Sequence, residues 1–160
     1  MTAAQLLDKM ADLESRIALI YERFVTQFRQ ALAVGDLWQS MGREELHHAD
    51  LLSRMDRGSG ATMDAQLEDH VRRLEAVVSR CESEQAQIDS LPQALAVTAD
   101  LEEAEAEHLH NVLNELGPGG RELAANPALQ HHTRGLLEYA IELYGDAALR
   151  QRLAWKSFRG

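Results

Sequence analysis

Apolar residues recur every three or four positions along most of this chain, the spacing that places side chains on one face of an α-helix. The first such stripe comprises Leu6, Met10, Leu13, Ile17, Tyr21, Phe24 and Phe28. Helix-favouring residues dominate, runs of β-branched residues are absent, and the 160 residues include only three prolines. The pattern therefore predicts an all-α fold.

Glycine, proline and capping residues divide the chain into five predicted helices and a final segment. The helices are expected to run over about residues 3–33, 36–57, 62–89, 90–116 and 126–144. Asp36 is expected to cap the second helix and Ser90 the fourth, with Pro92 in the first turn of the fourth. Residues 146–160 are predicted to form an amphipathic C-terminal piece that bears Leu149, Leu153, Trp155 and Phe158.

The third predicted helix has an apolar face that contains no acidic residue. This face comprises Leu67, Val71, Leu74, Val78, Cys81 and Ile88. We interpret the helix as a crossover that returns the chain, so that the second and fourth helices run parallel in a four-helix bundle. Residues 1–145 are assigned to the bundle, and residues 146–160 to a C-terminal helical extension of the same domain.

Composition and charge argue against a nucleic-acid partner, a cysteine-based site and a membrane span. The formal net charge of −10 argues against nucleic acid, because phosphate neutralisation needs clustered Lys and Arg. Cys81 is the single cysteine, so one chain can form neither a disulfide nor a cysteine-based zinc or iron site. The N-terminus lacks an export signal, and no apolar run approaches the roughly 20 residues that cross a bilayer. We expect a cytoplasmic protein with no membrane span.

Acidic and histidine residues interrupt the apolar stripes of separate helices. The interrupted stripes are Met41, Glu45, His48, Leu52 and Met55, and Leu95, Thr98, Glu102, Glu105, Leu109 and Val112. A buried carboxylate costs several kcal/mol unless it is paired, protonated or coordinated. Acids that face inward from distant segments therefore indicate bound cations, and a metal pair is the simplest source of that charge.

Glu45 and His48 form the strongest candidate pair. They lie three residues apart, so both side chains project from one helix face within reach of a common ion. Glu44 and His47 have the same spacing but align with polar residues, so we expect them on a solvated face. The alternative for Glu45 and His48 is a buried pair whose members hydrogen-bond each other.

The first helix adds Glu14, which lies on the inward stripe. Its alternative is a salt bridge with Lys9 or Arg16 at the boundary of the core. Tyr21 lies two turns later on the same stripe. It is expected either to pack in the core or to hydrogen-bond a ligand carboxylate.

The fourth and fifth helices supply the remaining candidates. Glu102 and Glu105 repeat the i, i+3 spacing of a ligand pair, and His108 follows on the flank of that stripe as a ligand or a surface histidine. On the fifth helix only His132 faces inward, either as a ligand or as a core histidine bonded to a neighbour.

The segments Glu14 to Phe24 and Trp38 to Ala49 resemble the paired iron-binding helices of the rubrerythrin-like branch of the ferritin-like di-iron carboxylate superfamily. The segment Ala99 to Glu105 is similar to that family's third ligand helix. The resemblance implies a ferritin-like bundle with iron ligated by Glu14, Glu45, His48, Glu102, Glu105 and His132. No Cys-x-x-Cys pair is present for a rubredoxin domain, so electrons are expected from iron itself or from an external donor.

The expected chemistry follows from carboxylates with one or two imidazoles, which suit iron, with manganese as the alternative. Two metal ions roughly 3.5–4 Å apart, bridged by Glu45, can hold a small oxidant between them. We expect Fe(II) oxidation coupled to reduction of hydrogen peroxide or dioxygen, as in a peroxidase or ferroxidase. Glu45 and His48 are the predicted catalytic residues.

A different reading of the chain is a metal-free helical module that mediates assembly. It rests on the C-terminal segment, where aromatic and basic residues alternate on an otherwise acidic chain. These residues are Arg150, Arg152, Trp155, Lys156, Phe158 and Arg159. The same segment can pack on its own bundle or on a second copy, and we expect a homodimer or higher oligomer.

Overall fold

The structure, a computed structural model, describes residues 1–56, 63–116, 118–126 and 134–157. Its helices are α1 (Ala3–Gln27), α2 (Leu32–Arg54), α3 (Ala65–Glu84), the short 3-10 helix η1 (Gln85–Gln87), α4 (Leu91–Glu115), α5 (Pro118–Ala124), α6 (Arg134–Tyr144) and α7 (Ala147–Ser157). No strand occurs in these ranges. The predicted all-α class is therefore confirmed.

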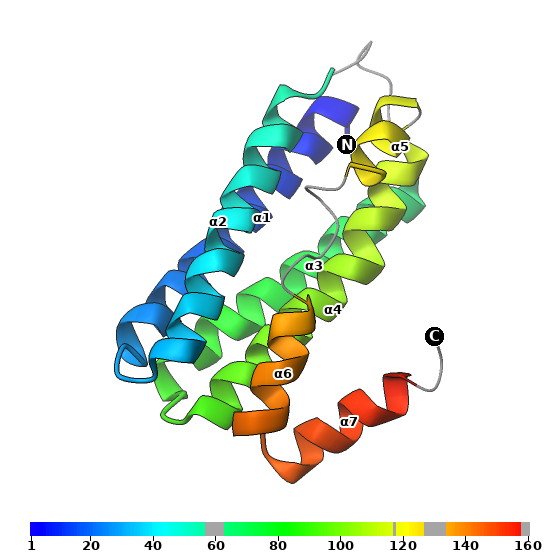
Figure 1. The fold of residues 1–160 in the computed structure, drawn as a ribbon. Helices are drawn as coiled ribbons and strands as arrows, with labels where there is room; N and C mark the ends of the chain where they lie inside the picture. The colour runs from blue at the N-terminus through cyan, green and yellow to red at the C-terminus, as the bar shows by residue number, and fades with distance from the viewer. Residues whose placement is uncertain (57–62, 117, 127–133, 158–160) are drawn as a thin grey trace.

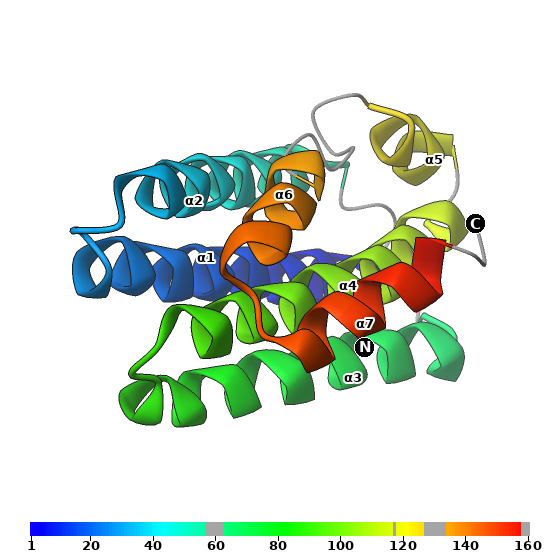
Figure 2. The ribbon, with the colours of Figure 1, turned by 60° about the horizontal axis from the view of Figure 1, so that its bottom comes forward.

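Two long helical hairpins, α1–α2 and α3–α4, pack side by side (Figure 1). The chain runs up α2, down α3 and up α4, so α2 and α4 run in the same direction, as predicted (Figure 1). Helix α6 lies against α2 and α4 (Figure 2). This arrangement brings α1, α2 and α4 around one shared interior.

The turn between α1 and α2 lies earlier than predicted. It occupies residues 28–31, so the break expected at residues 34–36 was wrong, and Asp36 does not cap α2. Val34 and Trp38 are both buried, 1% and 0% exposed, one turn apart on the inner face of α2. Because these side chains already fill the core at helical spacing, the chain has to enter the helix before residue 34.

The start of α4 agrees with its predicted cap. The side-chain Oε1 of Gln93 accepts a hydrogen bond from the backbone N of Ser90 at 3.2 Å, and Pro92 lies in the first turn. The glycine-rich segment after α4 does end that helix, but it also forms the short α5, which was not predicted. There the chain folds back so tightly that a Cβ added at Gly120 would collide with the carbonyl oxygen of Leu113.

Helix α3 has the structural role predicted for it. Its inner face is buried throughout and comprises Leu67, Val71, Leu74, Val78 and Cys81, with Ile88 buried just after η1. Two basic residues of α1 pair with its outer acids: Lys9 Nζ lies 2.7 Å from Glu75 Oε2, and Arg16 Nη2 lies 2.7 Å from Glu82 Oε2. The hydrogen bond from Arg16 lowers the pKa of Glu82.

The C-terminal part is helical, as expected for its amphipathic pattern. Helix α7 is anchored to α4 by Arg152, whose Nη1 lies 2.6 Å from Asp100 Oδ1. Leu149 is buried, whereas the side chain of Trp155 and the whole of Phe158 lie outside the described residues. The predicted start of the fifth helix near residue 127 lies outside them as well. None of the described helices is long and apolar enough to cross a bilayer.

A buried hydrogen bond joins α2 to α4 two turns before Glu45 and Glu105. Trp38 Nε1 donates to Thr98 Oγ1 at 2.9 Å, and both side chains are 0% exposed. Thr98→Val keeps the shape of the side chain but leaves the indole N–H unpaired, so we expect a loss of about 1–2 kcal/mol in the free energy of unfolding. Urea unfolding measures this loss, and Thr26→Val on the exposed face of α1 is the control. Equal stability of wild type and Thr98→Val would contradict it.

Candidate metal centre

Four of the predicted ligands converge inside the bundle. Glu14 comes from α1, Glu45 and His48 from α2, and Glu105 from α4. Each offers one ligand atom, and these atoms all lie within 4.8 Å of one another. The residues come from three helices and are up to 91 positions apart in sequence (105 − 14 = 91). They form a group that could hold a metal ion.

The group is sealed from solvent. Glu14 is 0% exposed, Glu105 1%, and Glu45 and His48 3% each. Both carboxylate oxygens of Glu14 and of Glu105 are buried and accept no hydrogen bond in the described part of the chain. Buried polar atoms are nearly always satisfied, so these four carboxylate oxygens need protons, a neighbouring charge or a bound cation.

His48 supplies the positive charge nearest to these acids. Its Nδ1 lies 3.0 Å from Glu45 Oε2 and 3.4 Å from Glu14 Oε2. Burial by itself lowers the pKa of His48, but the interactions with Glu14 and Glu45 outweigh it and raise that pKa from 6.5 to about 11. Without a metal, one imidazolium therefore faces three buried carboxyl groups.

The carboxyl groups are strongly perturbed in turn. Burial raises the pKa of Glu45 well above its ordinary value, and the hydrogen bond from His48 only partly opposes this shift. The pKa of Glu105 is also raised well above its ordinary value, by burial first and then by the charges of Glu14 and Glu45. Such shifts disappear when a divalent cation replaces the protons, because the charged carboxylates then gain a partner.

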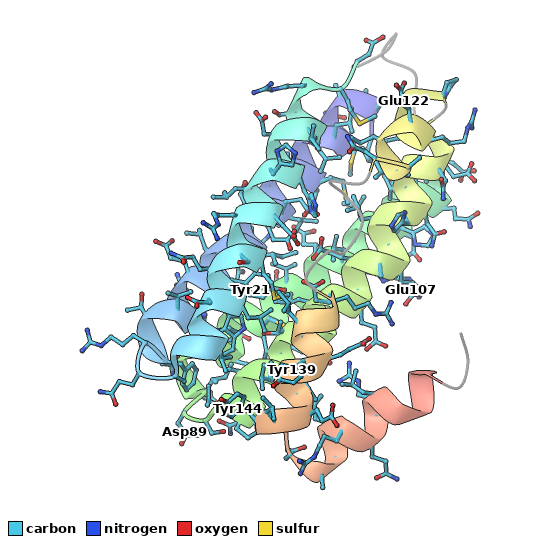
Figure 3. All side chains as sticks on the ribbon, viewed as in Figure 1. Tyr21, Asp89, Glu107, Glu122, Tyr139 and Tyr144 are labelled. Atoms are coloured by element: carbon cyan, nitrogen blue, oxygen red, sulfur yellow. The ribbon has the colours of Figure 1, made fainter. Side chains whose placement is uncertain are left out.

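Glu102 lies at the edge of the group and not within it. It is half-buried, and its Oε1 accepts a hydrogen bond of 2.8 Å from the hydroxyl of Tyr21. Tyr21 is fully buried inside the bundle (Figure 3), so it both packs in the core and orients a carboxylate, the two roles considered for it. The charge of Glu102 also raises the pKa of Glu45 and of Glu105. Ligation by Glu102 stays a prediction.

The salt bridge considered for Glu14 does not form. Lys9 and Arg16 both turn outward to acids of α3, so the nearest positive charge to Glu14 is His48. His132 lies outside the described residues, so its predicted role as a ligand stays a prediction.

His108 is buried, 6% exposed, and its partner is a residue that the sequence analysis did not single out. Its Nδ1 lies 3.0 Å from Nδ1 of His70 on α3. His70 follows Leu67 by three residues, so helical spacing places it beside the buried face of α3. This spacing is the one feature of the sequence that could have indicated a partner for His108.

The donor set fits a metal that accepts both oxygen and nitrogen. Three carboxylates and one imidazole suit Fe(II), Mn(II) or Zn(II), whereas an all-oxygen cage is typical of Ca²⁺ and Mg²⁺. The orphaned oxygens of Glu14 and Glu105 provide unused coordination on two sides of the group. The residues present therefore fit a resident metal centre.

Glu105→Leu is expected to stabilise the metal-free protein while it impairs metal binding. The change removes a buried carboxylate that has no partner, so we expect a gain of about 2 kcal/mol in the free energy of unfolding at pH 8. Urea unfolding in the presence of a chelator measures this gain, and Glu107→Leu on the exposed face of α4 is the matched control. A large destabilisation by Glu105→Leu would show that the carboxylate has a structural role and is not a strained ligand.

No family model, no curated protein and no solved structure matches this chain.

Proposed function

We propose that this protein is a di-iron carboxylate protein of the rubrerythrin-like kind, which oxidises Fe(II) and reduces hydrogen peroxide or dioxygen. The observation that carries the proposal is the convergence of Glu14, Glu45, His48 and Glu105 in a dry interior, with unsatisfied carboxylate oxygens. The parallel course of α2 and α4 is the one that ferritin-like connectivity requires, and it supports the proposal.

Each residue of the group has a separate role in such a site. Glu45 offers a carboxylate oxygen within 4.8 Å of the ligand atoms of Glu14, His48 and Glu105, so it would help to hold a metal together with any of them. His48 approaches Glu14 and Glu45 through Nδ1 and would orient one ion. The Tyr21 hydroxyl holds the carboxylate of Glu102 in place on the other side. Manganese is the alternative metal for the same donors.

Resident iron would supply two electrons, one from each Fe(II), so that H₂O₂ and two protons yield two molecules of water. The protein's own part is to exclude bulk water and to hold charge. The interior around Glu14, Glu45 and Glu105 is lined by α1, α2 and α4, and it keeps these acids less than 5% exposed. In so dry a site the carboxylates stabilise the increase in positive charge on oxidation more strongly than water would.

An anaerobic Fe(II) titration followed by air or peroxide tests this function. We expect two Fe(II) per chain and, on oxidation, the near-ultraviolet absorbance of ferric carboxylate centres. Competition with a chromogenic chelator gives the stoichiometry. One iron per chain would contradict the di-iron site but keep the metal centre, and absence of both binding and oxidation would overturn the proposal.

A second candidate is an assembly module, and the outer face of α6 favours it. Leu136, Tyr139 and Leu143 lie at helical spacing on this face and are 54%, 62% and 53% exposed, and Tyr139 lies on the outside of the helix (Figure 3). Exposed apolar side chains at such spacing are typical of a contact between copies. Wild-type protein that forms oligomers but neither binds nor oxidises iron would favour this candidate.

A further inference from the structure

A pair of histidines outside the carboxylate group joins α3 to α4. His70 and His108 face each other through their Nδ1 atoms at 3.0 Å, with ring centroids 5.3 Å apart. His108 is buried and lies one helical turn beyond Glu105, whereas His70 is partly exposed. The proposed iron chemistry uses neither residue.

The spacing of these two nitrogens is that of a chelating pair. Metal–imidazole bonds are ~2.0–2.1 Å long, so two nitrogens 3.0 Å apart would subtend an angle of ~90° at one ion. This angle is the one between neighbouring ligands in octahedral and square-planar coordination. For one ion to replace the hydrogen bond, each ring has to turn so that its Nδ1 lone pair points at the ion and not at the other nitrogen.

The protonation of the pair also suits a metal. Two Nδ1 atoms at hydrogen-bond distance require one ring to present a lone pair to the other. Burial lowers the pKa of His108, and the neighbouring His70 lowers it further, although Glu107 opposes the shift. His108 is therefore a neutral imidazole at pH 7, which is the form that ligates metals.

Access and further ligands come from an open cavity beside His70. The cavity has a volume of about 250 Å³. His70, Asn111 and Glu115 are among the residues that line it, and the last two carry side-chain oxygens. Water and these oxygens can complete the coordination of an ion held by the two rings, and the nearby acids favour a cation over an anion. Arg73 is a positive charge near the pair and would repel a cation. Asp69 offsets it, because Asp69 Oδ2 lies 2.6 Å from Arg73 Nε.

We propose that His70 and His108 form a second metal site, separate from the carboxylate centre, for a divalent transition-metal ion that prefers imidazole nitrogen, such as Cu²⁺, Ni²⁺ or Zn²⁺. The carboxylate centre offers mainly oxygen ligands and the histidine pair offers nitrogen, so the two sites differ in donor type. The chain then binds two classes of metal within one turn of α4.

Cu²⁺ is the probe, because its electron paramagnetic resonance spectrum reports bound nitrogens. One equivalent of Cu²⁺ added to the wild-type protein is expected to give the splitting of two imidazole nitrogens. His70→Gln should lose this pattern and bind Cu²⁺ at least about tenfold more weakly, since even outer-shell changes weaken metal sites by that factor. His108→Gln should behave in the same way.

Two control variants and a check of folding complete the test. His47→Gln, an exposed histidine on α2, should leave the spectrum unchanged, and so should Glu45→Ala, which alters only the carboxylate centre. His70 is partly exposed, so its variant is expected to fold even if His108→Gln does not. Circular dichroism and an unchanged Fe(II) stoichiometry in His70→Gln check this. An unchanged copper spectrum and affinity in His70→Gln, or the same loss in His47→Gln, would overturn the second site.

Discussion

Glu45→Ala is expected to abolish stoichiometric Fe(II) binding, with an affinity more than ~100-fold below that of wild type, because outer-shell changes alone cost 10–100-fold. Glu45 contacts His48 at 3.0 Å and raises the pKa of Glu105 by its charge, so it is the member that links both sides of the group. Its loss removes one of the four candidate ligands and also the carboxylate that lies 3.0 Å from His48 Nδ1. Competition with a chromogenic chelator under anaerobic conditions measures the change.

The matched control for this experiment is Glu44→Ala. Glu44 is the neighbouring residue on α2 and is partly exposed, whereas Glu45 is 3% exposed. Glu44→Ala should keep both the iron stoichiometry and the oxidation rate. If Glu45→Ala is folded by circular dichroism and still binds two irons as tightly as wild type, the metal centre proposed for α1, α2 and α4 is wrong.

The metal-free protein is expected to lose stability as the pH rises, by on the order of 3 kcal/mol between pH 5 and 8.5. The pKa of His48 is raised from 6.5 to about 11, so its stabilising contribution is complete below 6.5 and is lost as the pH rises through 11. The raised pKa values of Glu45 and Glu105 act with the same sign from about 4.5 upward, because the folded state keeps protons that the unfolded chain releases. Urea unfolding with a chelator at several pH values measures the slope.

Bound metal should abolish or reverse this slope. Ligation replaces the protons on His48, Glu45 and Glu105, so metal affinity rises with pH while the metal-free protein weakens. His47→Gln serves as a control, because the exposed His47 should leave the slope as in wild type. Stability that stays flat or increases over this range in the metal-free protein would mean that the buried acids are satisfied in some other way.

The turn between α1 and α2 illustrates how local signals mislead. Val34-Gly35-Asp36 has the composition of a helix break, yet these residues lie inside α2, and the turn occupies residues 28–31. Helix-breaking propensity is worth about 1 kcal/mol per residue, whereas burial of an aromatic such as Trp38 is worth several times that. Packing of the hairpin therefore decided the boundary.

The pair His70 and His108 shows a contact that the sequence pattern does not reveal. His108 was expected as a ligand or a surface histidine, and the surface alternative is wrong, because His108 is buried against His70. Its partner His70 lies on another helix and interrupts no apolar face in a recognisable pattern. A contact between α3 and α4 depends on the crossing geometry of two helices, which single-helix periodicity does not contain.

By itself the sequence determined the all-α class, the acid-free buried face of α3 and the inward position of Glu14, Glu45, His48 and Glu105, because helical periodicity assigns each side chain to a face. Only the tertiary structure decided that these four meet within 4.8 Å, that Glu102 binds Tyr21 at the edge, and that Lys9 and Arg16 pair with acids of α3 instead of with Glu14. The physical reason is that periodicity fixes direction within one helix, whereas depth and distance between helices follow from how their cores interlock.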